Sequence, residues 1–214
     1  IVTVFYRFLL TYAEEYSFKL YSFAGENLYF IPILFIGLAL IGAIVGTLTA
    51  KFKMIGGSGI PQVKGIIMGY FRDSWLSTVL AKFCGGVLAV FGGLSLGREG
   101  PSIQLGAGIG QAIGCKLGQS RNERRIYIAS GASAGLAAAF NAPLAGVVFC
   151  LEEIYKYFSP IILLSTMISA VASDFISRLI FGNQSVFSFN ITEKIPLDKY
   201  WALIILGIML GLFG

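Results

Sequence analysis

The sequence predicts an all-α membrane protein whose helices are tilted, unequal in length and partly re-entrant. Hydrophobic residues make up 56% of the 214 residues and charged residues only 13%, and the mean hydropathy is +0.79. A soluble globular domain does not need that balance. A simple spanning helix takes about 20 apolar residues, but several apolar segments here are shorter and are interrupted by glycine or proline. Such short, broken segments indicate half-length helices that line a cavity.

Seven or eight apolar segments are expected to form the helices. They cover residues 1–12, 29–50, 75–96, 102–118, 126–140, 143–158, 160–182 and 199–214. The connection 51–72 is basic and the connection 13–27 is acidic, so the positive-inside rule places the first in the cytoplasm and the second outside. The more polar stretch 186–198 is expected to be a surface connection. The chain has no initiating Met and stops within an apolar run, so we expect a fragment of a longer membrane protein.

The charges and the residue inventory argue against several functions. The net charge is +5, but the basic residues are not arranged with aromatic residues on one face, so no nucleic-acid partner is expected. There is no histidine, which removes Ser-His catalysis and histidine metal sites; we expect no metal, no cofactor and no enzyme activity. Cys84, Cys115 and Cys150 occur singly in apolar stretches and are expected to be reduced, buried packing residues.

Irregular backbone followed by a proline recurs three times before an apolar helix, at residues 56–61, 97–101 and 140–143. Proline suits the first helical position, where its missing N–H costs nothing, and the first of these helices is expected at about 61–70. A helix that starts at membrane depth has unpaired N–H groups, and an anion in a watery pocket would satisfy them. These three helix starts therefore indicate an anion site.

Glu99 and Ser58 are the candidate residues at these helix starts. Ionisable groups at membrane depth cost about 2.5–3.5 kcal/mol each, so they usually face a polar cavity. Glu99 is expected two residues before a helix start, where the helix dipole favours a carboxylate or a chloride ion. Protonation of Glu99 would free this position for an anion, so Glu99 would act as a gate. The alternative is that Glu99 is a structural helix cap paired with Arg98. The Ser58 hydroxyl either donates to an anion or belongs to an ordinary turn.

Other candidates lie away from these motifs. Glu152 and Glu153 end an apolar run, where they either emerge into water or accept a proton. Lys82 stands in an apolar segment, where it either snorkels or adds positive potential to an anion path. A further pattern concerns packing. Glycines recur every four residues, which predicts close helix contacts without chemistry; they are Gly106, Gly110, Gly114 and Gly118, with Gly131 and Gly135 in the next segment.

The motifs together resemble the ClC family of chloride channels and proton/chloride antiporters. Gly57-Ser58-Gly59-Ile60-Pro61 resembles the first anion-binding motif of that family, and Gly97-Arg98-Glu99-Gly100-Pro101 its gating motif. GASAGLAAAFNAPLAG, at residues 131–146, is similar to a third family stretch. The resemblance covers nearly the whole of 1–214 and implies the first of two inverted halves in a ClC-type bundle, truncated in its last helix, 199–214.

The resemblance implies a role for each matching residue. Ser58 would offer its hydroxyl to a central chloride, within an anion site formed by Gly57, Ser58, Gly59 and Ile60. Backbone amides of Arg98, Glu99 and Gly100 would line an outer position. Glu99 would be the gating glutamate and Glu153 the inner proton-transfer glutamate. Gln62 and Lys64 depart from relatives that carry carboxylates there, and the second half would have to supply a tyrosine hydroxyl and further amides.

The function that follows is secondary active exchange of chloride for protons, gated by a protonatable glutamate. The alternative is a passive voltage- or pH-gated chloride channel, and measured proton flux separates the two. An intramembrane enzyme using Ser58 as nucleophile lacks the usual base. The resemblance also implies a homodimer in a lipid bilayer, and we expect a multi-pass protein of the plasma membrane.

Overall fold

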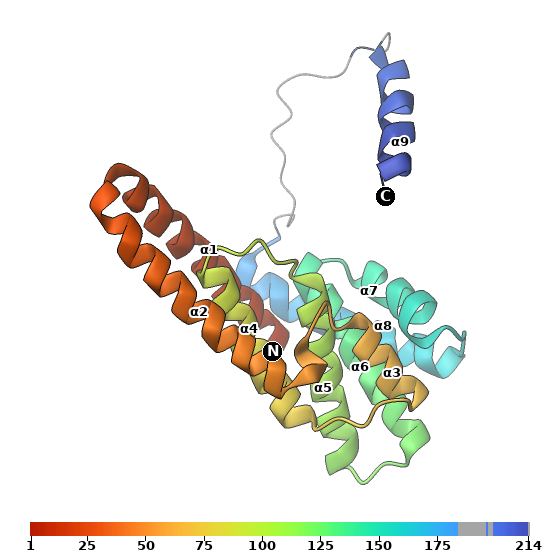
Figure 1. Ribbon diagram of the computed structural model, residues 1–214. Coiled ribbons are helices and arrows are strands. Elements are labelled where there is room, and N and C mark those ends of the chain that lie inside the picture. The colour runs from red at the N-terminus through yellow and green to blue at the C-terminus, as the bar shows by residue number, and fades with distance from the viewer. Residues whose placement is uncertain (184–195, 197–198, 214) are drawn as a thin grey trace. The chain divides into compact units, whose positions relative to one another are not determined.

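The computed structural model describes residues 1–183, 196 and 199–213, and the regular elements in these ranges are all helical (Figure 1). The chain divides into two units, residues 1–183 and residues 184–214. The helices of the first unit are α1 Val2–Glu26, α2 Ile31–Lys51, α3 Ile60–Met68, α4 Trp75–Phe91, α5 Glu99–Lys116, α6 Arg121–Phe140, α7 Pro143–Phe149 and α8 Pro160–Phe181. Short 3-10 turns at Leu28–Phe30 and Lys53–Ile55 and a π-helical turn, η3 Cys150–Tyr155, complete it.

The second unit contains α9, Trp201–Phe213. This helix is 13 residues long, strongly apolar and exposed along its described length. A helix within 199–214 is therefore confirmed, and its place as the truncated last helix of a family half stays a prediction. The predicted surface connection 186–198 lies, apart from Pro196, outside the described residues.

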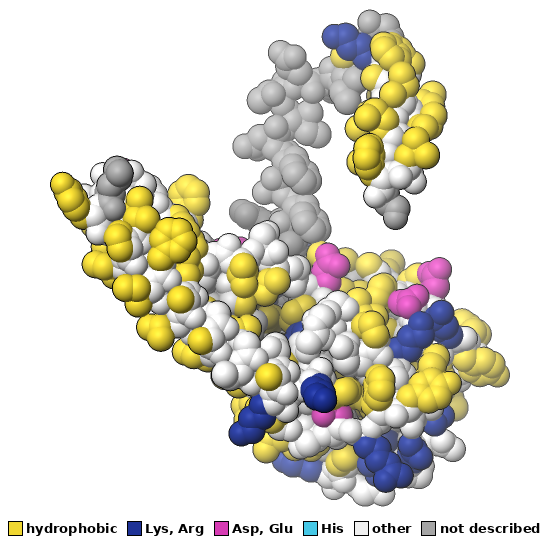
Figure 2. All heavy atoms as spheres, in the orientation of Figure 1, with side chains coloured by type: hydrophobic (Ala, Val, Ile, Leu, Met, Phe, Trp, Pro, Cys, Tyr) yellow, Lys and Arg dark blue, Asp and Glu magenta, His cyan; other side chains and the backbone are white. Residues whose placement is uncertain are grey.

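The helix lengths confirm the prediction of unequal helices. Within the described residues, α2 and α8 are long and apolar enough to cross a membrane, whereas α4 is apolar but shorter. The α3 helix has nine residues and α7 has seven. Many large apolar side chains are exposed on this surface, as Figure 2 shows along the arm formed by α1 and α2. That exposure is expected of helices whose surroundings are lipid or other membrane helices.

Several predicted boundaries were wrong, each for a local reason. The acidic stretch 13–27 is the second half of α1 and not a connection. Its charged residues lie on the exposed face, where Lys19 Nζ donates to Glu15 Oε1 at 2.6 Å, while Ala13, Ser17 and Ala24 face inward. The α6 helix begins at Arg121 instead of 126, because Ser120 and Glu123 form a reciprocal capping box.

The glycine pattern packs α5 directly against α6, as predicted. A methyl group at Gly106 would overlap the carbonyl oxygen of Gly131, and one at Gly110 would overlap the carbonyl oxygen of Tyr127. Gly135 lies in the same way against the carbonyl of Ser102. Gly118 departs from the pattern, because it ends the segment with a φ of +64° and no neighbour within 4 Å. Small residues at these positions let the two backbones touch.

The main hydrophobic core lies where α3, α5, α6 and η3 meet. It is built from Val63 and Ile67 of α3, Ile103 and Ala107 of α5, Ile128, Ala129, Ala132 and Leu136 of α6, and Cys150 and Ile154 of η3. Cys150 is buried as predicted and its thiol donates to the Ala129 carbonyl. Cys84 and Cys115 are free but exposed, so the prediction that they are buried was wrong: they lie on faces of α4 and α5 that the described residues leave uncovered.

Arg7 is a buried charge that sequence reasoning missed. It lies in α1 with only 7% of its surface exposed. Its Nη1 donates to the Ala138 carbonyl at 2.9 Å, to Asn141 Oδ1 at 2.7 Å and to Ser177 Oγ at 3.1 Å. These bonds tie α1 to the end of α6 and to α8. The irregular backbone before α7 is therefore held in part by a buried cation.

Candidate anion cavity between two helix starts

The loop before α3 is held in place by long-range hydrogen bonds to its carbonyl groups. Lys82 Nζ of α4 donates to the carbonyls of Ile55 and Gly57 at 2.8 and 2.7 Å. Gln62 Nε2 donates to the Gly56 carbonyl at 2.6 Å, and Gln104 Nε2 of α5 donates to the Met54 carbonyl at 2.7 Å. These bonds hold the loop through the carbonyl oxygens of residues 54–57, so the negative ends of these peptide groups are paired with side-chain donors.

Sequence reasoning missed the role of these three side chains. Lys82 neither snorkels nor faces solvent, since only 6% of it is exposed. Its ammonium group lies next to Gly57, which supports the alternative that it adds positive potential to an anion path. The signal for Gln104 was present, because an amide buried inside an otherwise apolar helix needs a partner. For Gln62 the sequence indicates only a departure from the family pattern and no hydrogen-bond partner.

Gly57 and Gly59 give this loop its shape. Their φ angles are +69° and +95°, a region that side chains with a Cβ rarely adopt. Gly59 forms the N-terminal boundary of α3, and a Cβ there would lie 2.6 Å from Gln104 Oε1. Ile60 and Pro61 then begin the helix. Ser58 remains exposed at the tip, and its Oγ accepts a hydrogen bond from the Ile60 amide at 3.4 Å.

The second motif lies directly against the first. A methyl group at Gly100 would overlap the carbonyl carbon and oxygen of Ser58. The start of α5 and the loop before α3 therefore touch through their backbones. Both helices direct the positive end of their dipoles toward this contact. Of the three predicted helix starts, these two are brought together, whereas residues 140–143 lie near Arg7 and Arg178.

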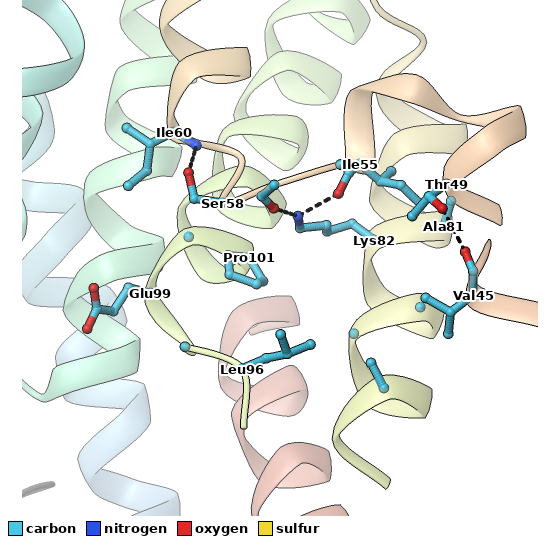
Figure 3. Close-up of a pocket in the computed structure, with 17 residues that line it drawn as sticks. Val45, Thr49, Ile55, Ser58, Ile60, Ala81, Lys82, Leu96, Glu99 and Pro101 are labelled. Carbon is cyan, nitrogen blue, oxygen red and sulfur yellow. Dashed lines mark hydrogen bonds between the residues drawn. The ribbon is translucent and has the colours of Figure 1, made fainter. Parts of the chain in front are cut away.

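Glu99 is the first residue of α5, with Arg98 at the N-terminal boundary. The prediction that Glu99 precedes the helix by two residues was wrong, because Pro101 occupies the third helical position and the first turn forms ahead of it. Glu99 is exposed, and Figure 3 shows its carboxylate pointing away from Lys82. Arg98 Nη2 pairs instead with Glu14 Oε2 of α1 at 2.5 Å.

A cavity of about 430 Å³ lies between these elements (Figure 3). Of the predicted anion-site residues, its lining includes Gly57, Ser58, Ile60, Glu99 and Gly100. Lys82 also borders it. Gly59 and Arg98 do not line the cavity. Gly59 is buried, and the Arg98 side chain pairs with Glu14. The cavity thus has two helix N-termini, a buried cation and a serine hydroxyl, which together attract a small anion.

Glu153 lies outside this cavity, on η3, where it pairs with a cation. Lys64 Nζ of α3 donates to Glu153 Oε1 at 3.1 Å, and both side chains are partly exposed. The hydrogen bond and charge of Lys64, together with the charge of Lys156, hold the pKa of the Glu153 carboxyl below its usual range. Glu152 is exposed beside it. One short helix, α3, therefore carries the Ser58 loop at its start and the partner of Glu153 further along.

The broken apolar helices and the cavity between two helix starts define a membrane-embedded protein suited to holding an anion. A family model described as "Voltage gated chloride channel" matches residues 41–214. The chain therefore belongs to this family of integral membrane proteins, and the resemblance drawn from its motifs is confirmed.

Individual relatives agree with this assignment. The chain is 38% identical over 162 residues to the "H(+)/Cl(-) exchange transporter ClcA" of Vibrio cholerae serotype O1, an alignment that covers 74% of this chain and 34% of the relative. The crystal structure of a slow cyanobacterial Cl-/H+ antiporter superposes with a TM-score of 0.75 at 32% identity, covering 99% of this chain and 52% of that one. A CLC-type fluoride/proton antiporter shares the fold, with a TM-score of 0.70 at 24% identity. The chain thus spans about a third of the curated relative it matches.

The contact between Gly100 and Ser58 gives a direct test of the cavity. In the full-length protein, Gly100→Ala should lower the free energy of unfolding by about 1–3 kcal/mol, because the added methyl group overlaps backbone that cannot rotate away. Gly97→Ala is the matched control, since a Cβ at Gly97 meets nothing within 4 Å. Thermal unfolding in detergent measures both, and equal midpoints for the two variants would contradict the contact.

Proposed function

We propose that the protein to which this chain belongs exchanges chloride for protons across a membrane. The observation that carries the proposal is the cavity in which the Ser58 loop meets the helix that begins with Glu99. The names of the relatives support the same pair of ions: one is a H(+)/Cl(-) exchange transporter and another a Cl-/H+ antiporter. Chloride and protons are the transported ions, and the proposal needs no cofactor and no enzymatic step.

In this proposal Ser58 donates its hydroxyl to chloride, and the amide of Gly57 and the start of α3 at Ile60 add to the inner site. The amides of Glu99 and Gly100, which line the cavity, attract the ion at the outer site. An ionised Glu99 competes with chloride for this positive region, since both are anions that helix starts favour. Protonation removes the charge of Glu99, and the anion can then enter. Proton uptake and anion movement are coupled by this exclusion.

Glu153 is proposed to pass protons between the cytoplasm and Glu99. Its position supports this role, because it is partly exposed and joined through Lys64 to the helix that follows the Ser58 loop. The rest of the pathway would come from the remainder of the protein, as would a homodimer interface. We also propose that the protein lies in the plasma membrane. If no proton flux is measured, a passive chloride channel is favoured instead.

The gate is tested with Glu99→Gln in full-length protein reconstituted into vesicles. Glutamine has the shape of the protonated carboxyl but no charge, so chloride flux should persist while proton flux falls to that of protein-free vesicles. The remaining chloride flux should also lose its dependence on pH. A pH electrode and a chloride electrode measure the two fluxes, and proton flux that survives the substitution would reject Glu99 as the gate.

The inner proton step is tested with Glu153→Gln in the same vesicles. An outward chloride gradient should drive protons uphill in the unmodified protein, and this movement should disappear in the variant while chloride still moves. Glu152→Gln is the matched control, because Glu152 is the adjacent, more exposed carboxylate. If both variants retain proton movement, the role proposed for Glu153 is wrong.

The ion pair between Lys64 and Glu153 predicts that replacing Lys64 shifts the pH dependence of proton flux. Since Lys64 holds the pKa of Glu153 below its usual range, Lys64→Met should raise that pKa and allow Glu153 to take up a proton at higher pH. The acidic rise of the proton-flux profile should therefore move toward higher pH, with Lys51→Met as an exposed control of equal charge. A profile that does not move would show that the ion pair has no part in proton uptake.

A further inference from the structure

A second cavity lies away from the Ser58 cavity and shares no lining residue with it. It has a volume of about 410 Å³ and lies among the end of α3, the connection that follows it and the start of α6. Four arginines line it, Arg72, Arg121, Arg124 and Arg125, and we call it the arginine pocket. Figure 2 shows Lys and Arg side chains gathered at this end of the first unit, where Figure 1 places the α5–α6 connection.

The arginines converge instead of spreading into solvent. Arg121 Nη2 and Arg125 Nη2 lie 3.1 and 3.7 Å from the position that a Cβ would take at Gly69, so their guanidinium groups meet over the end of α3. A basic loop that only satisfies the positive-inside rule does not require this convergence. The sequence placed Arg121, Arg124 and Arg125 in one basic connection, but their meeting with Arg72 depends on the fold.

The positive charge of the pocket is not neutralised within the described part of the chain. None of the ion pairs found there includes any of the four arginines. Arg121 and Arg124 donate to the carbonyls of Gly69 and Gln119 at 3.4 and 3.1 Å, bonds that leave their charge unpaired. Arg124 Nε is buried without a hydrogen-bond partner in the structure. A buried donor of this kind calls for an acceptor.

Two carboxylates lie near the four arginines, and neither forms an ion pair with them, so the pocket keeps an excess of positive charge. Asp73, which borders the pocket, accepts a hydrogen bond from Thr78 Oγ1 at 2.8 Å. Glu123 accepts from the amide and the hydroxyl of Ser120 at 2.9 and 2.7 Å, and these bonds lower the pKa of its carboxyl. The N-terminus of the 20-residue α6 adds further positive potential. An anion is therefore the missing counterpart.

The chemistry of the pocket selects the class of anion. Guanidinium groups bind phosphate oxygens through paired N–H donors, and several of them suit a group with more than one negative charge. The volume falls in the usual range for small-molecule sites. Ile66, Phe71 and Ile128 form an apolar wall beside the arginines, which suits a phosphate attached to an organic group.

We propose that the arginine pocket binds a phosphate-bearing anion on the membrane face that the sequence predicts to be cytoplasmic. The phosphate belongs either to a lipid headgroup or to a soluble compound, and both place the same group against the same arginines. The site is separate from the path proposed for chloride, so the inference does not depend on proton coupling.

The test uses the purified full-length protein, stripped of lipid, with two probes. Inorganic phosphate is titrated by calorimetry at constant ionic strength set with chloride, and phosphatidylglycerol is added back and counted by native mass spectrometry against phosphatidylcholine. Binding of phosphate alone would identify a soluble source, and binding of phosphatidylglycerol alone would identify lipid. Arg121→Gln with Arg125→Gln should weaken either binding at least about tenfold, since the double variant removes two charge-assisted hydrogen-bond donors from the pocket.

The control removes the same charge outside the pocket, through Lys51→Gln with Lys116→Gln, and should bind both probes as the unmodified protein does. Arg72→Gln lies outside every helix, so it tests the pocket even if the double variant does not fold. Absence of binding to both probes, or binding that both arginine variants leave unchanged, would overturn the proposal.

Discussion

The backbone contact between Ser58 and Gly100 is the interaction on which the candidate site depends. It joins a loop and a helix start that are far apart in the sequence, and it leaves no room for a side chain at position 100. The loop can approach so closely because Gly57 and Gly59 adopt left-handed backbone and because Lys82, Gln62 and Gln104 bind its carbonyls. With the carbonyls occupied, the cavity is lined by groups that favour negative charge.

The other charged groups follow one physical rule, which is that a charge taken from water needs a partner. Arg98 pairs with Glu14, Glu153 with Lys64, and Arg178 with Asp174 at 2.7 Å. Arg7 is satisfied by a carbonyl, an amide oxygen and a hydroxyl instead of a carboxylate. Among the described residues, two places differ from this pattern. Glu99 is exposed at a helix start, and the arginine pocket gathers cations without a carboxylate partner in the described structure.

These two exceptions have different consequences. At the first, the proposed gate rests on competition between a carboxylate and a small anion for the same helix-start potential. At the second, several guanidinium groups gather without a carboxylate partner in the described structure, so the place calls for a ligand and not for a gate. Separation of the two sites means that phosphate binding and proton coupling can be measured independently of each other.

Local sequence was enough to predict the all-α membrane fold, the helix that follows Pro61, the glycine contacts of α5 with α6 and the family. The first three rest on composition or on the spacing of residues within one helix, and the family rests on the resemblance of three motifs. The wrong boundaries at 13–27 and 126 were also local, and the Ser120–Glu123 capping box and the Glu15–Lys19 pair would have corrected them. Only the tertiary structure decided which charges meet. Arg98 pairs with a residue 84 positions away and Lys64 with one 89 positions away, and no periodicity relates residues that the packing of separate helices brings together.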